Sequence, residues 1–472
     1  MTRSPSYLAQ NQYGYCFRMR VPHDLQSCVG KKELKRSLET GYLPQARSKA
    51  MKMGGRYKLL LEWVRDQSRM GKMAKIKNVS DFRGAGRLTI DAITGITDLT
   101  EELHHAIASI AGILGEPDQH RSKGITGLVY RNIRAVSGLV GGGIDAALDK
   151  LDSLLGKKDS APGREAVLAV LNGVLGDHLA ASNNPLAIPM RLRRNGEPLS
   201  MGDPAFSKAI LESGGKLALM VHGSCMNDLQ WNRQGHDHGT ALAHDLGYLP
   251  IYLHYNTGLH ISENGRSFSE LMETSINQLP HPIELVIIAH SMGGLVSRSA
   301  CHSGKLAGHT WMNHLHKLVF LGTPHHGAPL ERGGNWIDIL LNISPYSAPF
   351  SRLGKIRSAG ITDLRYGNLS DDDWKGRDRF ERAGDGRAAV PLPEGVQCYA
   401  IAATIAKESS KIGGNLLGDG LVTLNSALGR HENADLNLLF PETNQWVGRD
   451  MNHLSLLNQP EVYETINRWL KN

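Results

Sequence analysis

The sequence predicts an α/β fold, with a mostly parallel sheet and helices on both of its faces, over the C-terminal part of the chain. Two observations predict it. From Gly215 onward, short and nearly all-apolar runs alternate with stretches of helical pattern. In addition, a serine between small residues, Ser291, directly follows one of these runs. Short apolar runs are typical of strands buried on both faces of a parallel sheet, so a doubly wound domain is expected.

The elements of this domain follow from the same alternation. Helical stretches around 240–246, 267–278 and 294–302 separate four of the apolar runs, which gives the order β-α-β-α-β-α-β. The five predicted strands are 217–221, 249–253, 285–288, 318–321 and 398–402. Active sites in such sheets lie at the carboxyl ends of the strands. The serine at 291 falls at one of these ends.

The segment Ile288-Ala289-His290-Ser291-Met292-Gly293-Gly294-Leu295 has the pattern of a nucleophile elbow. A serine on a tight strand-to-helix turn needs small residues two positions to each side, because only then can a strained backbone hold its hydroxyl above the sheet. Ala289 and Gly293 are those neighbours. The motif alone could arise by chance in a chain this rich in glycine, so its weight depends on the residues that follow it.

A serine hydroxyl needs a base to accept its proton and a third group to orient that base. Asp419 lies in the Gly-flanked segment Leu417–Val422, just after the last predicted strand, and His453 precedes a C-terminal helix that ends at Trp469. The order Ser291, Asp419, His453 differs from the order in the chymotrypsin-like and subtilisin-like proteases. We therefore predict these three residues as nucleophile, orienting acid and base.

An oxyanion formed at this serine would need backbone N–H donors. The segment Val221-His222-Gly223-Ser224-Cys225 leaves the first predicted strand with a glycine where the chain must turn. The N–H groups of Ser224 and Met292 are the first candidates, and that of Cys225 is a neighbouring one.

These motifs together resemble the bacterial lipases and esterases of the α/β-hydrolase superfamily, over about the last 260 residues. The resemblance also includes Leu321-Gly322-Thr323-Pro324-His325-His326-Gly327. Where that superfamily has Gly-x-Ser-x-Gly, this chain has Ala289 at the first position. The resemblance implies a serine nucleophile, a histidine that acts first as base and then as acid, an orienting aspartate and no cofactor. The residues predicted to contact substrate are His222, Gly223, His325 and Trp336.

Other residues compete for these roles. His290 is next to the nucleophile and is expected to point away from it. His326 could line the pocket together with His325, or the two histidines could fix the conformation of the loop that contains them. The rival base is His431, in a setting that reads as a surface turn, and the rival acids, which precede the last predicted strand, are Asp338, Asp363 and Asp385.

Residues 327–395 are predicted to form a cap insertion over the site. The segment Trp336–Leu341 gives this insertion an apolar helix, which suits acyl chains because ligand pockets are mostly apolar. The acidic run Asp371-Asp372-Asp373 could bind calcium, but it lacks the spaced ligands of a calcium-binding loop and reads better as a solvated loop. No metal site is predicted.

The sequence before this domain divides into two parts. Residues 73–205 carry apolar residues at spacings of three and four, which predicts a helical accessory region, and the catalytic domain is expected over 206–472. Packing of the helices on that domain is favoured over a membrane-surface role, because their polar faces carry acidic as well as basic residues.

Residues 1–72 are strongly basic, with 15 Lys and Arg against 5 Asp and Glu. Tyr13–Pro22 alternates like a strand, Lys35–Leu38 could be its partner, and a helix is expected from about Leu43 to Gln67. This part resembles the arm-type N-terminal segment of phage integrases, the tyrosine recombinases. Their catalytic constellation does not follow, so recombination is not expected. The resemblance implies at most a weak nucleic-acid contact through phosphates, and the alternative is a solvated basic face or fusion remnant.

Composition restricts the remaining possibilities. Hydrophobic residues make up 41% and charged residues 21%, and the sequence contains neither an apolar stretch of membrane-spanning length nor a secretory signal pattern, so a cytoplasmic location is expected. The five cysteines are scattered and are expected to be free thiols. The oligomeric state is left open.

The predicted activity is hydrolysis of carboxylic esters, with an apolar acyl chain, through an acyl-enzyme formed on Ser291. Esterase and lipase are both compatible with the sequence. Two alternatives stay open: a nucleic-acid-binding protein that acts through residues 1–72, and an acyltransferase that uses the same three residues.

Overall fold

The computed structural model of the chain divides into two compact units. One consists of residues 1–160 and 182–186, and the other of residues 161–181 and 187–472. The residues that the structure describes are 7–11, 14–26, 32–38, parts of 42–50, 161–200, 203–279, 282–328, 358–377, 385–406 and 418–471. The larger unit contains the predicted α/β domain, and it starts before residue 206, the boundary expected from the sequence.

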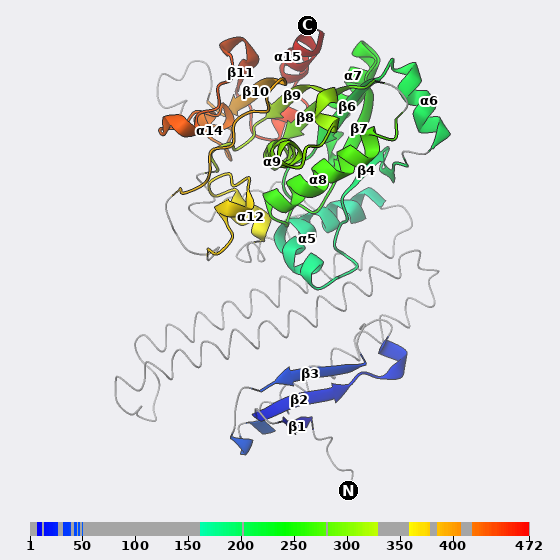
Figure 1. Ribbon diagram of the computed structural model, residues 1–472, viewed down its shortest axis with the longest axis vertical. Coiled ribbons are helices and arrows are strands. Elements are labelled where there is room, and N and C mark those ends of the chain that lie inside the picture. The colour runs from blue at the N-terminus through cyan, green and yellow to red at the C-terminus, as the bar shows by residue number, and fades with distance from the viewer. Residues whose placement is uncertain are drawn as a thin grey trace. The chain divides into compact units, whose positions relative to one another are not determined.

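The larger unit is built on one eight-stranded sheet with the strand order β11-β10-β9-β8-β6-β7-β4-β5 (Figure 1). The strands from β11 to β7 in this order are parallel, whereas β4 and β5 are antiparallel at one edge. The strands are β4 Arg191–Arg194, β5 Glu197–Pro198, β6 Lys216–Val221, β7 Leu249–His254, β8 Glu284–His290, β9 Leu315–Leu321, β10 Gln397–Thr404 and β11 Gln445–Arg449. The predicted mostly parallel sheet is confirmed.

All five strands predicted from apolar runs are present as β6 to β10. In the central strands every residue of the apolar run is buried, as in 285–288 of β8, because helices cover both faces of a parallel sheet. The sequence analysis missed β4, β5 and β11. Each of them is short or carries charged and polar residues, so none has the apolar signature of a central strand.

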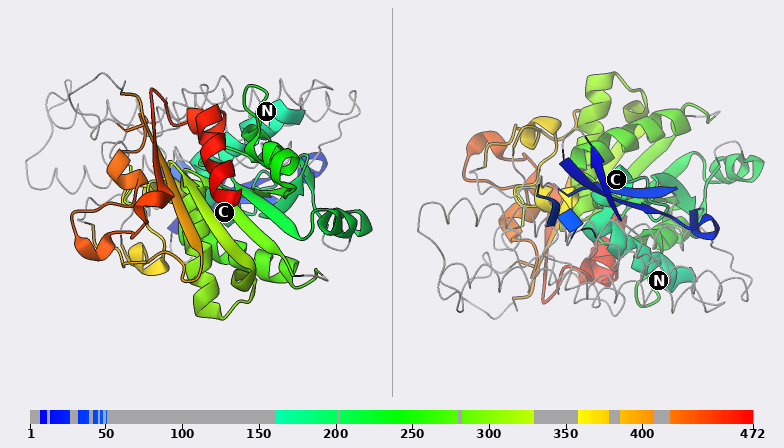
Figure 2. Two further views of the ribbon diagram at one scale, coloured as in Figure 1. Left: turned by 90° about the horizontal axis from the view of Figure 1, so that it is seen from above. Right: turned by 90° about the horizontal axis from the view of Figure 1, so that it is seen from below.

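Helices lie on both faces of the sheet (Figure 2). Helices α8 and α9 pack side by side on one face, and α7 and α15 contact each other on the other. The described helices of this unit are α5 Ala161–Ala181, α6 Pro204–Glu212, α7 His238–Leu246, α8 Ile261–Ile276, α9 Met292–Ala307, α12 Ala359–Asp363, α14 Leu424–Ala427 and α15 Pro460–Lys471. The described 3₁₀ turns of the chain are η1 His23–Leu25, η2 Asp228–Trp231, η3 Trp311–His314, η5 Asp371–Asp373, η6 Ala434–Leu436, η7 Glu442–Asn444 and η8 Ser455–Leu457.

Local signals in the sequence explain where the helices begin and end. Asp237 is the N-cap residue of α7. Its carboxylate accepts a hydrogen bond of 2.8 Å from the N–H of Thr240. Gly247 ends the same helix with a φ of 74°, and Gly308 ends α9 with a φ of 67°. Left-handed backbone of this kind favours glycine.

Helix α5 belongs to the unit that contains the sheet. Residues 166–176 of this helix are buried without interruption, so it has no polar face of its own over that stretch. The hydroxyl of Ser358 donates to the Gly173 carbonyl over 2.6 Å, and the Ala359 N–H donates to the Asp177 carboxylate over 3.0 Å. These bonds join α5 to the start of α12. The third helical run of the predicted accessory region is therefore part of the larger unit's core.

The smaller unit contains a three-stranded antiparallel sheet, β1 Leu8–Asn11, β2 Gly14–Arg20 and β3 Glu33–Ser37 (Figure 1). The predicted strand and its partner are thus present, and β1 is an addition. Apolar side chains on one face form the core of this unit: Phe17, Val21, Leu34, Leu38, Ala46 and Ala50. Most of the predicted helix from Leu43 to Gln67, and the predicted helical region before residue 161, lie outside the described residues.

None of the helices in the described part of the chain has the length and apolar character that crossing a membrane requires.

Candidate functional site

Ser291 is the one residue between strand β8 and helix α9, and its backbone is strained. Its φ is 55° and its ψ is −125°, in a region that residues other than glycine rarely adopt. The turn is held by a hydrogen bond of 2.8 Å from the Ser291 N–H to the carbonyl of Leu321. A side chain at Gly293 would come within 2.5 Å of the Val221 carbonyl oxygen, which explains why the motif needs a glycine there. The residue is buried, with 2% of its surface exposed.

Asp419 and His453 form a hydrogen-bonded pair inside the protein. His453 Nδ1 lies 2.6 Å from Asp419 Oδ2, and both side chains are buried. The other carboxylate oxygen, Oδ1, accepts from the N–H groups of Leu421 at 2.9 Å and Val422 at 2.8 Å. The His453 N–H donates to the Asp419 carbonyl over 3.0 Å. The glycine-flanked loop thus fixes the carboxylate, which in turn holds the imidazole with Nδ1 protonated.

This pair lies at the same end of the sheet as Ser291. A Cβ on Gly322 would be 3.2 Å from both Asp419 Oδ2 and His453 Cε1, and Gly322 directly follows the residue that holds the serine backbone. In addition, His290 Nε2 is 3.2 Å from the His453 carbonyl, and the two imidazole rings are 4.7 Å apart. The fold therefore brings together three residues that are 128 and 34 positions apart in the chain.

His453 Nε2 is buried and has no hydrogen-bond partner among the described residues. An imidazole nitrogen without a proton, when its Nδ1 is protonated and held by a carboxylate, is a proton acceptor. An unpartnered buried acceptor costs stability, and such groups are common where a reaction supplies the missing partner.

The loop after β6 lies against the serine. A Cβ on Gly223 would be 3.0 Å from the Cβ of Ser291, so a side chain here would press against the serine. The Cys225 N–H is already used, because it donates to the Thr257 hydroxyl over 3.1 Å. By contrast, the N–H groups of Ser224 and of Met292, the first residue of α9, have no acceptor among the described residues. The first N–H groups of a helix have no partner inside the helix.

Buried aromatic and charged side chains support this loop. The ring of His222 stacks on Tyr255 with the centroids 4.4 Å apart, and the Tyr255 hydroxyl donates to the His222 carbonyl over 2.8 Å. Burial lowers the pKa of His222 to about 3, so the ring is neutral. His222 and Gly223, both predicted to contact substrate, thus lie in the loop beside the serine.

A charged cluster follows the same loop. Asp228 Oδ1 is 2.9 Å from His254 Nδ1 and 3.2 Å from Arg193 Nη1, and Arg193 Nη1 is also 2.9 Å from Glu165 Oε2. The favourable charges of Arg193 and His254 outweigh burial and lower the pKa of Asp228. The cluster ties α5, β4 and β7 to the loop. The sequence analysis missed it because its members come from four remote segments and share no motif.

The other two residues predicted to contact substrate are His325 and Trp336. His325 is fully buried after β9; its Nδ1 is 3.3 Å from Arg298 Nη1, and its ring packs against Phe320 and Phe440. Trp336 lies outside the described residues, as does most of the predicted cap from 327 to 395.

The rival acids that the structure describes and the rival base form hydrogen bonds or ion pairs with residues other than Ser291, Asp419 and His453. Asp363 accepts from His260 Nδ1 over 3.0 Å and from the Ile261 N–H over 2.9 Å, where it caps α8. Asp385 is 3.2 Å from Arg387 Nε and 3.6 Å from His431 Nε2. The remaining rival, Asp338, is not among the described residues.

The acidic run has protein donors around its carboxylates. Asp371 receives hydrogen bonds from Ser262, Arg266 and Lys375, and Asp373 Oδ2 accepts from two backbone N–H groups at the start of η5. These donors, mainly Arg266 and Lys375, lower the pKa of Asp371 despite its partial burial. Within the described residues, the structure contains no group of three or more side chains that could hold a metal ion.

The sheet order, the strained serine after β8 and the loops that carry Asp419 and His453 after β10 and β11 define an α/β-hydrolase fold. Consistent with this, residues 212–381 match a family described as PGAP1-like alpha/beta domain. Residues 7–66 match a domain of unknown function, DUF6538, so the expected integrase-like character of this segment is not confirmed.

Comparisons with solved structures give remote similarity. A mature-form lipase of Bacillus licheniformis has 16% identity and a TM-score of 0.36, with 60% of this chain and 98% of the lipase covered. A lipase-esterase related protein from Clostridium acetobutylicum has 14% identity and a TM-score of 0.31, with 60% and 98% covered. Lipase B of Aspergillus fumigatus has 10% identity and a TM-score of 0.34, with 70% and 79% covered. No curated protein matches the sequence.

Proposed function

We propose that this protein hydrolyses carboxylic esters through an acyl-enzyme on Ser291. The observation that carries the proposal is the combination of a strained serine with a buried Asp419–His453 pair whose Nε2 has no partner in the described part of the chain. Nucleophile, base and orienting acid are the three parts that serine catalysis needs. Their order along the chain is that of α/β-hydrolases.

In the proposed reaction, the Ser291 hydroxyl attacks the acyl carbon while His453 Nε2 takes its proton. The tetrahedral intermediate then collapses, the bond to the alcohol oxygen breaks, and His453 returns the proton to the departing alcohol. Water attacks the acyl-serine in the same way, which releases the carboxylic acid and regenerates the serine. Asp419 keeps Nδ1 protonated and stabilises the imidazolium that forms in each half of the reaction.

The N–H groups of Ser224 and Met292 are the proposed oxyanion donors. The proposal is supported by the closeness of Gly223 to Ser291 and by the absence of an acceptor for either N–H among the described residues. It also favours Ser224 over Cys225, because the Cys225 N–H is held by Thr257. Loss of one such donor typically costs about 2.7–4 kcal/mol of transition-state stabilisation.

The test is an acyl-length series of p-nitrophenyl esters with the full chain and with Ser291→Ala. The variant is expected to lose activity by a factor on the order of 10³ or more. Ser303→Ala, on the same helix, is the matched control and is expected to keep full activity. Retention of most of the activity by Ser291→Ala would rule out the proposal. The length of the preferred acyl chain separates a short-chain esterase from a lipase.

Acyl transfer to an alcohol remains an alternative with the same residues. Product analysis in the presence of added alcohols distinguishes the two reactions: an acyltransferase forms the new ester in preference to the free acid even when the alcohol is dilute relative to water.

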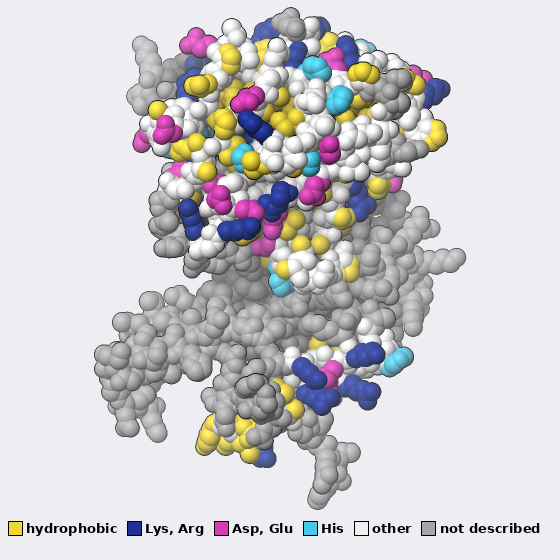
Figure 3. Space-filling view, in the orientation of Figure 1, with side chains coloured by type: hydrophobic (Ala, Val, Ile, Leu, Met, Phe, Trp, Pro, Cys, Tyr) yellow, Lys and Arg dark blue, Asp and Glu magenta, His cyan; other side chains and the backbone are white. Residues whose placement is uncertain are grey.

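Nucleic-acid binding by the N-terminal unit is a second, independent candidate. Arg18, Arg20, Lys32 and Lys35 are exposed in or beside β2 and β3, and basic side chains gather over this unit in Figure 3. Glu33 pairs with Arg18 and with Lys35 at 3.1 Å, which offsets part of the charge. If the unit binds phosphates, retention of the full chain on DNA falls steeply with salt and falls further in Arg20→Gln. Salt-independent retention would contradict it.

A further inference from the structure

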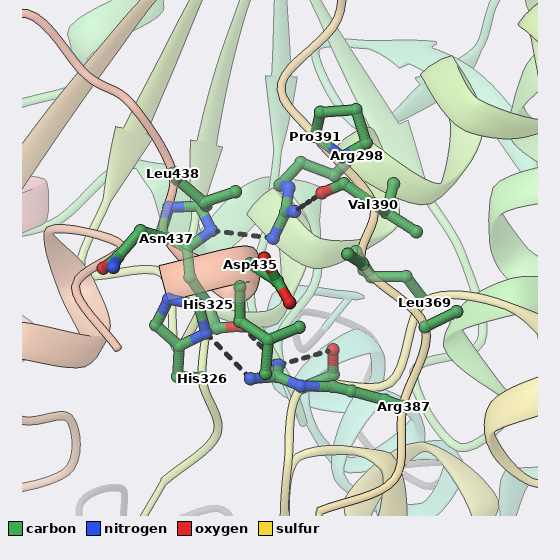
Figure 4. Close-up of a pocket in the computed structure, with 14 residues that line it drawn as sticks. Arg298, His325, His326, Leu369, Arg387, Val390, Pro391, Asp435, Asn437 and Leu438 are labelled. Carbon is green, nitrogen blue, oxygen red and sulfur yellow. Dashed lines mark hydrogen bonds between the residues drawn. The ribbon is translucent and has the colours of Figure 1, made fainter. Parts of the chain in front are cut away.

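A small cavity is lined by helix α9, the loop that follows β9 and three later segments of the chain (Figure 4). Its volume is about 80 Å³, which leaves room for a group of only a few non-hydrogen atoms, since a water molecule takes about 30 Å³ in the liquid. Its polar lining is dominated by two arginines, Arg298 and Arg387, and two histidines, His325 and His326.

Arg298 is a buried cation with no counterion among the described residues. It is 4% exposed, and its guanidinium donates to the Val390 carbonyl and to His325 Nδ1, both of which are neutral acceptors. Its Nε has no partner, and no carboxylate of the described residues lies within ion-pair distance of it. Burial lowers the pKa of Arg298 to about 9. A buried charge is normally paired, and the described part of the chain supplies no carboxylate to pair with this arginine.

Arg387 brings a second guanidinium to the same cavity. Its side chain is 7% exposed; Nη1 donates to the His325 carbonyl over 2.8 Å, and Nη2 lies 2.8 Å from His326 Nδ1. Its ion pair with Asp385 spans 3.2 Å. The charge of Arg387 further lowers the pKa of Arg298. Two cations thus repel each other across a space that neither fills.

The histidines do not relieve this excess of positive charge. Burial lowers the pKa of His326 to about 3 and that of His325 well below its usual value, so both rings are neutral near pH 7. The carboxylate in the lining is that of Asp435, which lies in an exposed turn and forms no ion pair with either arginine. Other exposed lining residues are Ala388, Ala389 and Pro391, so the cavity opens to solvent on this side.

We propose that this cavity is a binding site for a small oxyanion, with Arg298 and Arg387 as its cationic ligands. Phosphate fits such a site, because guanidinium groups bind its oxygens through paired N–H donors. The ion would lie between the two guanidinium groups and compensate the charge of Arg298, while Arg387 keeps its ion pair with Asp385. The site is distinct from Ser291: Arg298 is seven residues further along α9, roughly 10 Å at 1.5 Å per residue. It does not depend on the proposed esterase activity.

The experiment measures binding of inorganic phosphate and of glycerol phosphate to the full chain by isothermal titration at pH 7, against sodium chloride at equal ionic strength. Saturable binding with one site is expected. Binding of both compounds means that the site binds a phosphate group that is part of a larger molecule as well as the free ion. Binding of inorganic phosphate alone means that it holds the free ion.

Three variants and one control assign the binding to this cavity. Arg298→Gln and Arg387→Gln are expected to weaken binding about tenfold or more, since each removes charge-assisted hydrogen bonds. Asp435→Asn removes the negative charge at the rim and is expected to tighten binding several-fold. Arg266→Gln removes a surface arginine that pairs with Asp371, and it should leave binding unchanged.

Two results would overturn the proposal. One is the absence of saturable binding by either phosphate compound, and the other is binding of the same strength in the wild type and Asp435→Asn. Asp435 is exposed, so its substitution tests the site even if the variants of the buried arginines fail to fold. Unfolding of those variants is checked by circular dichroism.

Discussion

His453 Nδ1 and Asp419 Oδ2 are 2.6 Å apart inside the protein, and the second oxygen of the carboxylate is held by two backbone N–H groups. The aspartate thus has no freedom to turn away, and it fixes which nitrogen of the imidazole carries the proton. This arrangement leads to the first prediction.

Asp419→Asn is expected to lower kcat for ester hydrolysis by about three orders of magnitude while the protein stays folded. An amide that donates to Nδ1 would force the proton onto Nε2, and the base would then have the wrong tautomer. The measurement is kcat and KM for a p-nitrophenyl ester. Asp363→Asn is the matched control: it also removes a buried carboxylate that accepts from a histidine, and it is expected to cost stability and to spare kcat. Equal losses of kcat in both variants would contradict the assignment.

Thr257→Val is expected to lower kcat about tenfold, with KM nearly unchanged. The Thr257 hydroxyl accepts from the N–H of Cys225, a residue whose φ of 58° is itself strained. Without this acceptor the loop loses a bond that fixes the backbone next to Ser224, and an unpaired buried N–H costs about 1–3 kcal/mol.

Thr323→Val provides the comparison for this variant. The Thr323 hydroxyl is buried without a hydrogen-bond partner among the described residues, so its removal should leave kcat and stability at or above the wild-type values. If Thr257→Val behaved like Thr323→Val, the proposed role of the Thr257 hydrogen bond would be wrong.

Gly293→Ala is expected to destabilise the protein and to abolish activity. The added methyl group would come within 2.5 Å of the Val221 carbonyl and 2.6 Å of the His222 carbonyl, which are backbone atoms that cannot move alone. Gly376→Ala is a suitable comparison, because a Cβ there meets nothing within 4 Å and only the φ of 74° is unfavourable. Thermal unfolding should show a clearly larger loss for Gly293→Ala.

The free energy of unfolding is expected to fall as the pH drops from about 6.5 to about 4. Burial lowers the pKa of His238 to about 4. Its Nε2 must donate to the Leu456 carbonyl at 2.9 Å, so its Nδ1 accepts from His236 at 2.8 Å. In this interval the unfolded chain takes up a proton that the folded protein excludes. Stability is therefore present above the pKa of the unfolded histidine and is lost toward the folded pKa, by at most about 3 kcal/mol.

His238→Gln should reduce this dependence on pH, measured as the slope of the unfolding free energy from urea denaturation at several pH values. His244→Gln, which alters an exposed histidine, should leave the slope unchanged. The prediction for His238 fails if both variants retain the wild-type slope.

The sequence by itself determined the central sheet and the segments that follow the carboxyl ends of its strands. Strands β6 to β10 have an apolar signature because both of their faces are buried. The small residues around Ser291 are a local requirement of its turn, so they also appear in the sequence. For the same reason, Asp419 and His453 could be predicted as candidates from the loops that contain them.

Only the tertiary structure decided how these segments meet. It brought Asp419 and His453 to 2.6 Å, assigned the Cys225 N–H to Thr257, and joined α5 to the unit that contains the sheet. It also showed the short strands at the edges and the two arginines that share one cavity. None of these features has a periodic pattern, because each depends on contacts between residues far apart in the chain. The physical reason is that burial of a whole strand leaves a mark on its composition, whereas a single hydrogen bond or ion pair does not.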